Sequence, residues 1–305
     1  MSESRRGLRH RIGEIRLHKL ERKTYSIGFV IPWLLIYGVF FVLPTLFSFY
    51  YAFTDWDLTS AKFSGFANFV EMFRNPVFST ALANTAIFTV LSVVLKVAVS
   101  LALAMALFHC VASNFFRTIF FSPYVLSYIA IGVLFTAIMH PEIGVLNKGL
   151  RAIGLDFLAL NWLVEKGQVI YSLVFIDVWK SAGFHLAIFI AALQTIPSDM
   201  MESASIDGAG PWKKFRYITF PMLASAFNAN IVFALIVGLT KFDLVFVTTG
   251  GGPGYYSEVL KTLVYKQFAM GRYGLATAGE LIIFVIVITL TVTLRKFLDK
   301  REVEA

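Results

Sequence analysis

The chain has 305 residues, of which 57% are hydrophobic and only 15% are charged, and its mean hydropathy is +0.72. This composition is far more apolar than that of a soluble globular domain, so a bilayer is the expected solvent. The net charge of +8 is explained by topology and contact with anionic lipid, and nucleic-acid binding is not expected. The single cysteine, Cys110, excludes an intramolecular disulfide and a cysteine-based metal cluster.

Six apolar segments are each long enough to cross about 30 Å of hydrocarbon, which takes roughly 20 residues. They are 27–53, 82–108, 119–139, 169–193, 222–246 and 275–294. The first is too long for a signal peptide and is not followed by a small-residue cleavage site, so it is interpreted as an uncleaved span. The sequence therefore predicts an all-α polytopic membrane protein with six transmembrane helices at 27–298, between a basic tail (1–26) and a short tail (299–305).

An even number of spans places both termini on one side of the membrane. Sixteen of the 27 Lys and Arg residues fall on that side, and eight fall in the loops of the opposite side. Because basic residues are retained on the cytoplasmic face, both termini are expected to be cytoplasmic.

The outward loops carry no signature of phosphate binding. The glycine-rich segment TTGGGPG at 248–254 lacks the Lys-Ser/Thr pair of a Walker A loop and is expected to form a tight outward turn. The aromatic residues of 54–76 favour the interface between lipid and water, so this loop is expected to lie along the outer surface. ATP binding by the chain itself is not expected.

A polar, glycine-broken stretch, ESASIDGAGPWKKFRYITFP at 202–221, separates the fourth and fifth spans on the cytoplasmic side. Pro197 and a capping box of Asp199 with Glu202 predict the start of a short helix. Gly208 is expected to end it in the left-handed conformation, and Pro211 to begin a second helix. The prediction is an elbow of two short helices at 197–221.

The spacing E-S-A-x3-G-x9-I-x-F-P in this stretch resembles the EAA loop of inner-membrane permeases of binding-protein-dependent ABC importers. Serine replaces one alanine and phenylalanine replaces leucine, and every interval fits. In that family the loop sits in a cleft of a cytoplasmic ATPase subunit. The resemblance implies ATPase-coupling roles for Glu202, Ser203, Ala204, Asp207, Gly208, Ile218 and Pro221.

Two further segments, 31–56 and 242–254, resemble sugar permeases of the MalF type and glycerol-3-phosphate permeases. The likeness covers nearly the whole chain after residue 25, without the large periplasmic insertion of the maltose protein. It implies a type I ABC importer permease fold in a bacterial or archaeal cytoplasmic (inner) membrane. It further implies import of a mono- or oligosaccharide, a sugar phosphate or a glycerol phosphate.

The same resemblance implies the partners: a second, MalG-like permease subunit, two cytoplasmic ABC ATPase subunits, an extracytoplasmic solute-binding protein and membrane lipid. The chain itself would carry no cofactor, no metal and no catalytic residue, because ATP and Mg bind to the ATPases. The contrasting class is an ion-coupled secondary carrier for a small polar solute, with Asp177, Lys180 or Asp243 as the relay.

Charges at mid-bilayer depth cost about 2.5–3.5 kcal/mol on insertion scales, so they face a cavity or a partner. Asp177 and Lys180 lie three residues apart, which predicts an ion pair on one helical face or, alternatively, substrate contacts. Lys96 is expected to be a buried partner of a carbonyl or carboxylate group, and His185 a hydrogen-bonded packing residue.

Comparison with the maltose-type permease implies a set of substrate-path residues. They are Trp179, Lys180, Ser181, Phe184, Gly238 and Lys241. Trp179 offers an aromatic platform for a sugar ring. The two lysines do not fit a maltose site and favour an anionic ligand such as a sugar phosphate. Zinc-binding spacings and catalytic carboxylate pairs do not stand out, so a membrane enzyme is not expected.

Overall fold

The computed structural model describes residues 29–108 and 110–299. The chain divides into two compact units, Met1–Tyr51 and Ala52–Ala305, and each is described by itself. The predicted basic tail, the first residues of the predicted first span and the end of the C-terminal tail lie outside the described residues.

The described part of the first unit is one apolar helical run, Ile31–Tyr51, long enough to cross a membrane. It consists of α2 (Ile31–Tyr37), the π-helical η2 (Gly38–Val42) and α3 (Leu43–Tyr51). The π turn ends two residues before Pro44, which has no N–H to donate to the Phe40 carbonyl four residues earlier. Thr45 Oγ1 donates to the carbonyl of Phe41 over 2.7 Å, which compensates the irregular turn.

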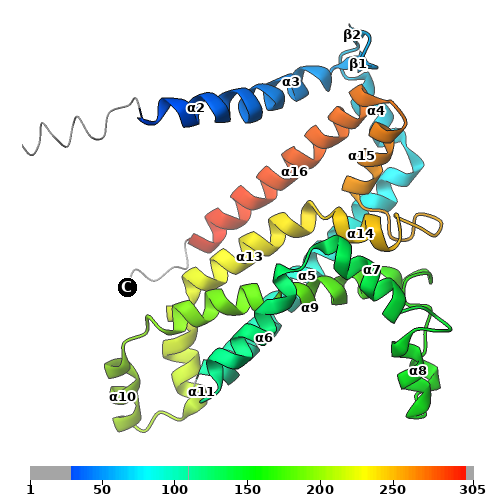
Figure 1. Cartoon of the computed structure of the whole chain (residues 1–305). Coiled ribbons are helices and arrows are strands. Elements are labelled where there is room, and N and C mark those ends of the chain that lie inside the picture. The colour runs from blue at the N-terminus through cyan, green and yellow to red at the C-terminus, as the bar shows by residue number, and fades with distance from the viewer. Residues whose placement is uncertain (1–28, 109, 300–305) are drawn as a thin grey trace, which may run out of the picture. The chain divides into compact units, whose positions relative to one another are not determined.

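The second unit is almost entirely helical, with one short hairpin (Figure 1). Its elements are β1 (Thr54–Trp56), β2 (Ala61–Phe63), α4 (Ala67–Arg74), α5 (Pro76–Phe108), α6 (Ser113–Val125), α7 (Tyr128–Ile138), α8 (Val145–Ala152), η3 (Asp156–Leu158), α9 (Val169–Leu193), α10 (Ser198–Ile206), α11 (Pro211–Lys214), η4 (Phe215–Thr219), α12 (Phe220–Met222), α13 (Ala224–Leu239), α14 (Asp243–Thr248), α15 (Leu260–Ala269) and α16 (Tyr273–Asp299).

The prediction of an all-α membrane fold is confirmed, and two predicted spans need correction. Among the described residues, four helices are long and apolar enough to cross a membrane, or up to six if each of two bent pairs is one span. The predicted span 119–139 is broken between α6 and α7, which meet at 96°. The predicted span 222–246 ends with α13 at Leu239, and the chain restarts as α14 at Asp243.

Each break has a local cause in the sequence. Pro123 lies inside α6 and has no backbone N–H to donate, so it weakens the last turn of that helix. Ser127 then caps α7, and its Oγ accepts from the Ala130 N–H over 3.2 Å. Before α14, the residues Thr240, Lys241 and Phe242 leave the helical conformation, which places a lysine in a non-helical segment between two apolar helices.

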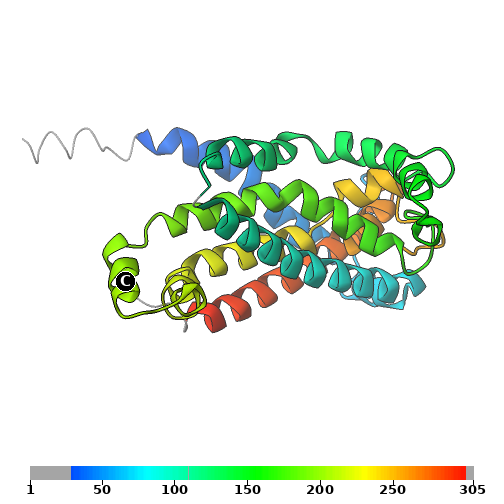
Figure 2. The same ribbon diagram turned by 90° about the horizontal axis from the view of Figure 1, so that it is seen from below.

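Helix α9 is the centre of the second unit. It packs against α5, α6 and α13, while α16 lies alongside α13 and α15 (Figure 2). Most of α9 is buried, with Ile176, Leu186 and Phe189 among its fully covered side chains. The outer faces of α5 and α16 remain apolar and exposed, as expected for surfaces in contact with hydrocarbon.

The elbow and the hairpin lie at opposite ends of the second unit (Figure 1). The loop predicted to follow the outer surface contains the antiparallel pair β1 and β2, in which Thr54 pairs with Phe63. Asn68 fixes the start of this hairpin, since its Nδ2 donates to the carbonyls of Ala52 (3.1 Å) and Thr54 (2.8 Å).

Candidate functional site

The most polar part of the helical core is a group of buried charges on one side of α9, here named the Asp177 cluster: Lys96, Tyr128, Asp177 and Lys241. Asp177 on α9 has no exposed surface. Its Oδ2 lies 2.6 Å from Lys96 Nζ on α5, and its Oδ1 lies 2.7 Å from Lys241 Nζ in the α13–α14 break. One carboxylate thus joins three segments that are distant in the sequence.

The predicted pair of Asp177 with Lys180 is wrong. Lys180 Nζ instead donates to the backbone carbonyl of Tyr124 over 2.7 Å. That carbonyl lies in the last turn of α6, where the break leaves backbone groups without helical partners. The expectation for Lys96, a buried partner of a carboxylate, is confirmed.

Tyr128, the first residue of α7, lies among the three lysines. Its hydroxyl donates to Asp177 Oδ1 over 2.8 Å. The ammonium groups of Lys241 and Lys180 lie 4.0 and 4.5 Å from the centre of its ring, within the range of cation–π attraction. Ser181 Oγ lies 3.4 Å from the Tyr128 hydroxyl. Tyr128 is not among the residues predicted from the sequence, although its position directly after the helix-capping Ser127 marks the break.

The two helix breaks meet the same stretch of α9. The break after α6 contributes Tyr124 and Tyr128, which contact Lys180 and Asp177. The break after α13 contributes Lys241, which pairs with Asp177. Irregular backbone inside a membrane must be buried in protein or line a cavity, and here both breaks place polar side chains against buried groups of α9.

Two glycines allow the close packing around this site. A Cβ at Gly238 of α13 would lie 2.9 Å from Thr89 Cγ2, so α13 and α5 meet there without room for a side chain. A Cβ at Gly183 of α9 would lie 2.1 Å from the Phe120 carbonyl oxygen of α6. Gly238 is therefore required for the close packing of α13 against α5.

The two aromatic substrate-path candidates, Phe184 and Trp179, differ in their surroundings. Phe184 stacks on Tyr124 with ring centres 4.8 Å apart and packs against Phe233. Trp179 is 40% exposed and packs edge-on against Phe135. Trp179 thus leaves part of its ring accessible, whereas Lys180, Ser181 and Lys241 are buried.

His185, one turn further along α9, has the packing role that was expected of it. Its Nδ1 lies 2.7 Å from Asn230 Oδ1 of α13, and both residues are buried. Groups of three or more residues able to hold a metal ion do not occur among the described residues.

The elbow is built as predicted except at its start. Pro197 occupies the N-cap position and no side chain caps the helix, so the predicted capping box of Asp199 with Glu202 is wrong. At the other end Gly208 has φ +74°. The N–H groups of Gly208 and Ala209 donate to the carbonyls of Ser205 and Ala204, which is the Schellman arrangement of a helix end.

The coupling candidates lie in α10, in the turn at Gly208 and at the end of the second short helix. Glu202, Ser203, Asp207 and Gly208 are exposed, and Ala204, Ile218 and Pro221 are half-buried. Apolar side chains at the elbow are also exposed: Ile206 (87%), Trp212 (72%) and Tyr217 (74%). Lys214 Nζ donates to Ser205 Oγ over 2.5 Å and links the two short helices.

Comparisons with known proteins place this architecture in context. The family model described as binding-protein-dependent transport system inner membrane component matches residues 98–303. The probable ABC transporter permease protein YurN of Bacillus subtilis is 36% identical, over 91% of this chain and 97% of its own length. The multiple sugar-binding transport system permease protein MsmF of Streptococcus mutans is 30% identical, over 94% of this chain and 99% of its own.

A solved structure shows the same fold. A chain of a bacterial ABC transporter involved in the import of the acidic polysaccharide alginate superposes with a TM-score of 0.81. It is 24% identical in sequence, and the superposition covers 93% of this chain and 99% of that one.

Proposed function

The chain belongs to the family of binding-protein-dependent transport system inner membrane components, and we propose that it is the MalF-type permease subunit of an ATP-driven sugar importer. The sugar follows from the functions for which relatives are named, among them the multiple sugar-binding transport permease of Streptococcus mutans. A relative in Yersinia pestis is named as an sn-glycerol-3-phosphate permease, so sugar phosphates and glycerol phosphate belong to the proposed substrate class.

The exposed elbow is the observation that carries the proposal. Its turn is held by backbone hydrogen bonds, yet Ile206, Trp212 and Tyr217 remain exposed on it. Exposed apolar side chains grouped on a folded element mark a contact with protein or membrane, and the resemblance to the EAA loop favours protein. We assign that partner as a cytoplasmic ABC ATPase subunit, which binds ATP and Mg and hydrolyses ATP, while this chain catalyses no bond chemistry.

A second, MalG-like permease subunit, a second ATPase subunit and an extracytoplasmic binding protein complete the proposed assembly, with both termini of this chain cytoplasmic. Movement of the ATPases would shift the elbow and rock the helices as semi-rigid bodies. The breaks beside α9 are where the pathway would open, near Trp179, Lys180 and Lys241.

The Asp177 cluster gives no support to the alternative of an ion-coupled carrier. A relay carboxylate must exchange a proton or an ion during transport. Asp177 is instead held by two ammonium groups and a tyrosine hydroxyl. Family membership also favours the ATP-driven importer.

Transport by the reconstituted assembly tests the proposal. The ligand of the binding protein encoded beside this chain is first identified by thermal stabilisation in a panel of sugars and sugar phosphates. Proteoliposomes with all subunits should then transport that ligand only when ATP is present on the side of the ATPases. Uptake by this chain alone on an ion gradient would refute the proposal.

A further inference from the structure

The Asp177 cluster and the neighbouring Lys180 carry more positive than negative charge. Three lysines, Lys96, Lys180 and Lys241, are buried near a single buried carboxylate. Asp243 follows Lys241 by two residues, but it is exposed and forms no ion pair with it. The part of the chain that the structure describes therefore has two more positive than negative charges at this site when all three lysines are protonated.

The contacts of these lysines do not require the surplus charge. Lys96 alone is enough to neutralise Asp177. The Tyr124 carbonyl that meets Lys180 needs only a hydrogen-bond donor, which an uncharged side chain also supplies. Charged side chains inside a membrane are costly and are kept at functional sites. The surplus therefore indicates a ligand that brings negative charge.

We propose that the substrate carries a negative charge, on a phosphate or a carboxylate group, and that Lys180 and Lys241 bind this group as the substrate passes the two helix breaks. The inference rests on the proposed function and narrows its substrate class from sugars in general to anionic ones. An anionic substrate takes over Lys241 from Asp177, which keeps Lys96 as its counter-ion. The carboxylate thus remains neutralised at every stage.

The two lysines converge on one place although they come from different segments. The ammonium groups of Lys241 and Lys180 lie 4.0 and 4.5 Å from the centre of the Tyr128 ring. A phosphate or carboxylate group has several acceptor oxygens and can accept hydrogen bonds from both. Both lysines are buried, and rigid-body movement of helices at the breaks would uncover them. Binding of the anion is therefore tied to opening of the pathway.

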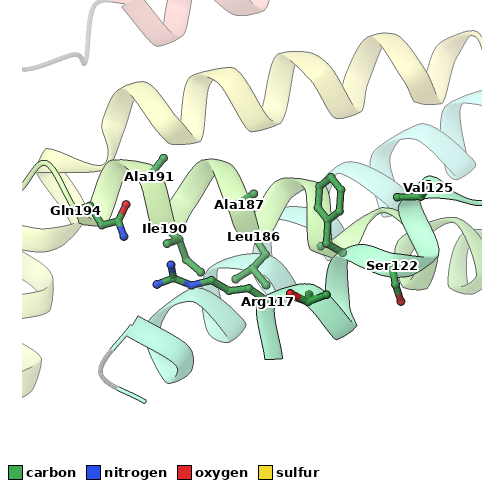
Figure 3. Close-up of a pocket in the computed structure, with 11 residues that line it drawn as sticks. Arg117, Ser122, Val125, Leu186, Ala187, Ile190, Ala191 and Gln194 are labelled. Carbon is green, nitrogen blue, oxygen red and sulfur yellow. The ribbon is translucent and has the colours of Figure 1, made fainter. Parts of the chain in front are cut away.

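The same face of α9 continues past a further cation. Lys180, Phe184 and Ala187 follow one another on one helical face, and a groove of about 550 Å³ runs on between α6 and α9 (Figure 3). Arg117 of α6 lines it with a buried Nε that makes no hydrogen bond. The described residues of the lining include no acidic side chain. A path along this face is basic beyond the two lysines, which suits an anion.

The charge of the transported ligand is the first test. The binding protein encoded beside this chain is screened with glycerol 3-phosphate against glycerol, glucose 6-phosphate against glucose, and galacturonate against galactose. The phosphate and carboxylate arms separate the two sources of negative charge. Proteoliposomes with all subunits should take up an anionic member at least about tenfold faster than its neutral counterpart. ATP-driven uptake of neutral members alone would overturn this inference and leave the proposed function standing.

Two variants of Lys180 separate its charge from its hydrogen bond. Lys180→Gln keeps a donor for the Tyr124 carbonyl and removes the charge, whereas Lys180→Arg keeps the charge. With the same binding protein, Lys180→Gln should lower uptake of the anionic ligand about tenfold, and Lys180→Arg should retain most of it. Lys62→Gln is the control, because Lys62 is exposed on β2. Equal uptake by the two Lys180 variants would show that the charge is not needed and would overturn the proposal.

Ligand protection gives a readout that does not depend on transport. The assembled importer in nanodiscs is treated with an amine-acetylating reagent, with and without the non-hydrolysable nucleotide AMP-PNP, and acetylated peptides are identified by mass spectrometry. Anionic members of the panel should protect Lys180 and Lys241, neutral members should not, and Lys62 should react equally throughout.

Equal protection by anionic and neutral members, or no acetylation of either buried lysine in any state, would overturn the proposal. Protection by an anion in a complex that shows no ATP-driven uptake would refute the proposed function and leave the anion site standing.

Discussion

The Asp177 cluster and the elbow are both polar interruptions of an apolar chain, and they differ in how their groups are satisfied. In the cluster, Asp177 is fully buried and its carboxylate is matched by Lys96, Lys241 and Tyr128 of the same chain. At the elbow, backbone groups are satisfied locally, while Glu202 and Ile206 are exposed. The first region is completed by intramolecular contacts, and the second presents a surface that another protein can complete. A change in the cluster should therefore affect folding, and a change at the elbow should affect coupling.

The largest effect is expected for Asp177→Asn. The substitution leaves two buried ammonium groups without a counter-charge, and breaking a buried pair in this way costs about 3–5 kcal/mol. That is a large share of a total stability of roughly 5–15 kcal/mol. Membrane abundance and the thermal unfolding midpoint of the purified protein should both fall. The exposed Asp199→Asn serves as the control and should change neither.

A second variant asks whether the cluster is needed for folding at all. Replacing all three charges together, with Lys96→Met, Asp177→Leu and Lys241→Met, removes the burial cost along with the attraction. Stability should return close to that of the wild type, because apolar replacement of a complete buried ion network is often neutral or stabilising. If transport is then lost, the charges serve the pathway and not the fold.

Gly208→Val should have a smaller effect on stability and a large effect on coupling. Gly208 has φ +74°, and a Cβ added there would meet no atom within 4 Å, so the cost is backbone strain of about 1–2 kcal/mol and not a clash. The chain should insert normally, while ATPase activity stops responding to loaded binding protein. Gly210 also has open space around it but a φ of −68°, so Gly210→Val is the matched control. Equal behaviour of the two variants would show that the left-handed turn is not required for coupling.

Lys180→Met should change stability by less than about 1 kcal/mol, because the lost hydrogen bond to the Tyr124 carbonyl is offset by removal of a buried charge. Uptake should nevertheless fall if Lys180 lines the path at the α6–α7 break. Initial uptake rates at matched protein abundance measure this. Wild-type uptake would remove Lys180 from the substrate-path set.

The smallest effect is expected at the tip of the hairpin, where the exposed Asp57 carboxylate accepts hydrogen bonds from residues of the same turn. Hydrogen bonds from the Ser60 and Thr59 backbone N–H groups and their hydroxyls lower the pKa of Asp57 from 3.8 to about 2. The carboxylate therefore stabilises the turn above pH 3.8, and that stabilisation is lost as the pH falls toward 2. At about pH 5 the carboxylate is ionised, so the Ser60 amide should exchange its hydrogen more slowly in the wild type than in Asp57→Ala. Asp55→Ala is the control and should leave this exchange rate unchanged. Equal exchange in Asp57→Ala and the wild type would contradict the assignment.

The sequence predicted those features that depend on local patterns. The bounds of α9 agree with the apolar run 169–193, and Gly208 ends α10 because the positive φ required there suits glycine. The break at Ser127 also has a local signal in the preceding Pro123, and the prediction of one span at 119–139 rested on apolar length alone. Asp177 illustrates the limit of this reasoning. Its nearest lysine in the sequence is Lys180, and its actual partners lie 64 and 81 residues away, which spacing along one helix does not indicate.

The length of α5 has a consequence for how the protein fits its membrane. Its 33 residues extend for about 50 Å, well beyond the roughly 30 Å of hydrocarbon in an average bilayer. Such a mismatch is relieved by tilting or by emergence of the helix ends into the headgroup region. Lys96 ties α5 to Asp177 of α9, and Ser100 Oγ of α5 donates to the Ala182 carbonyl of α9, so the two helices must tilt together. Transport should therefore depend on lipid chain length, because a thinner or thicker bilayer tilts α5 and α9 as a pair.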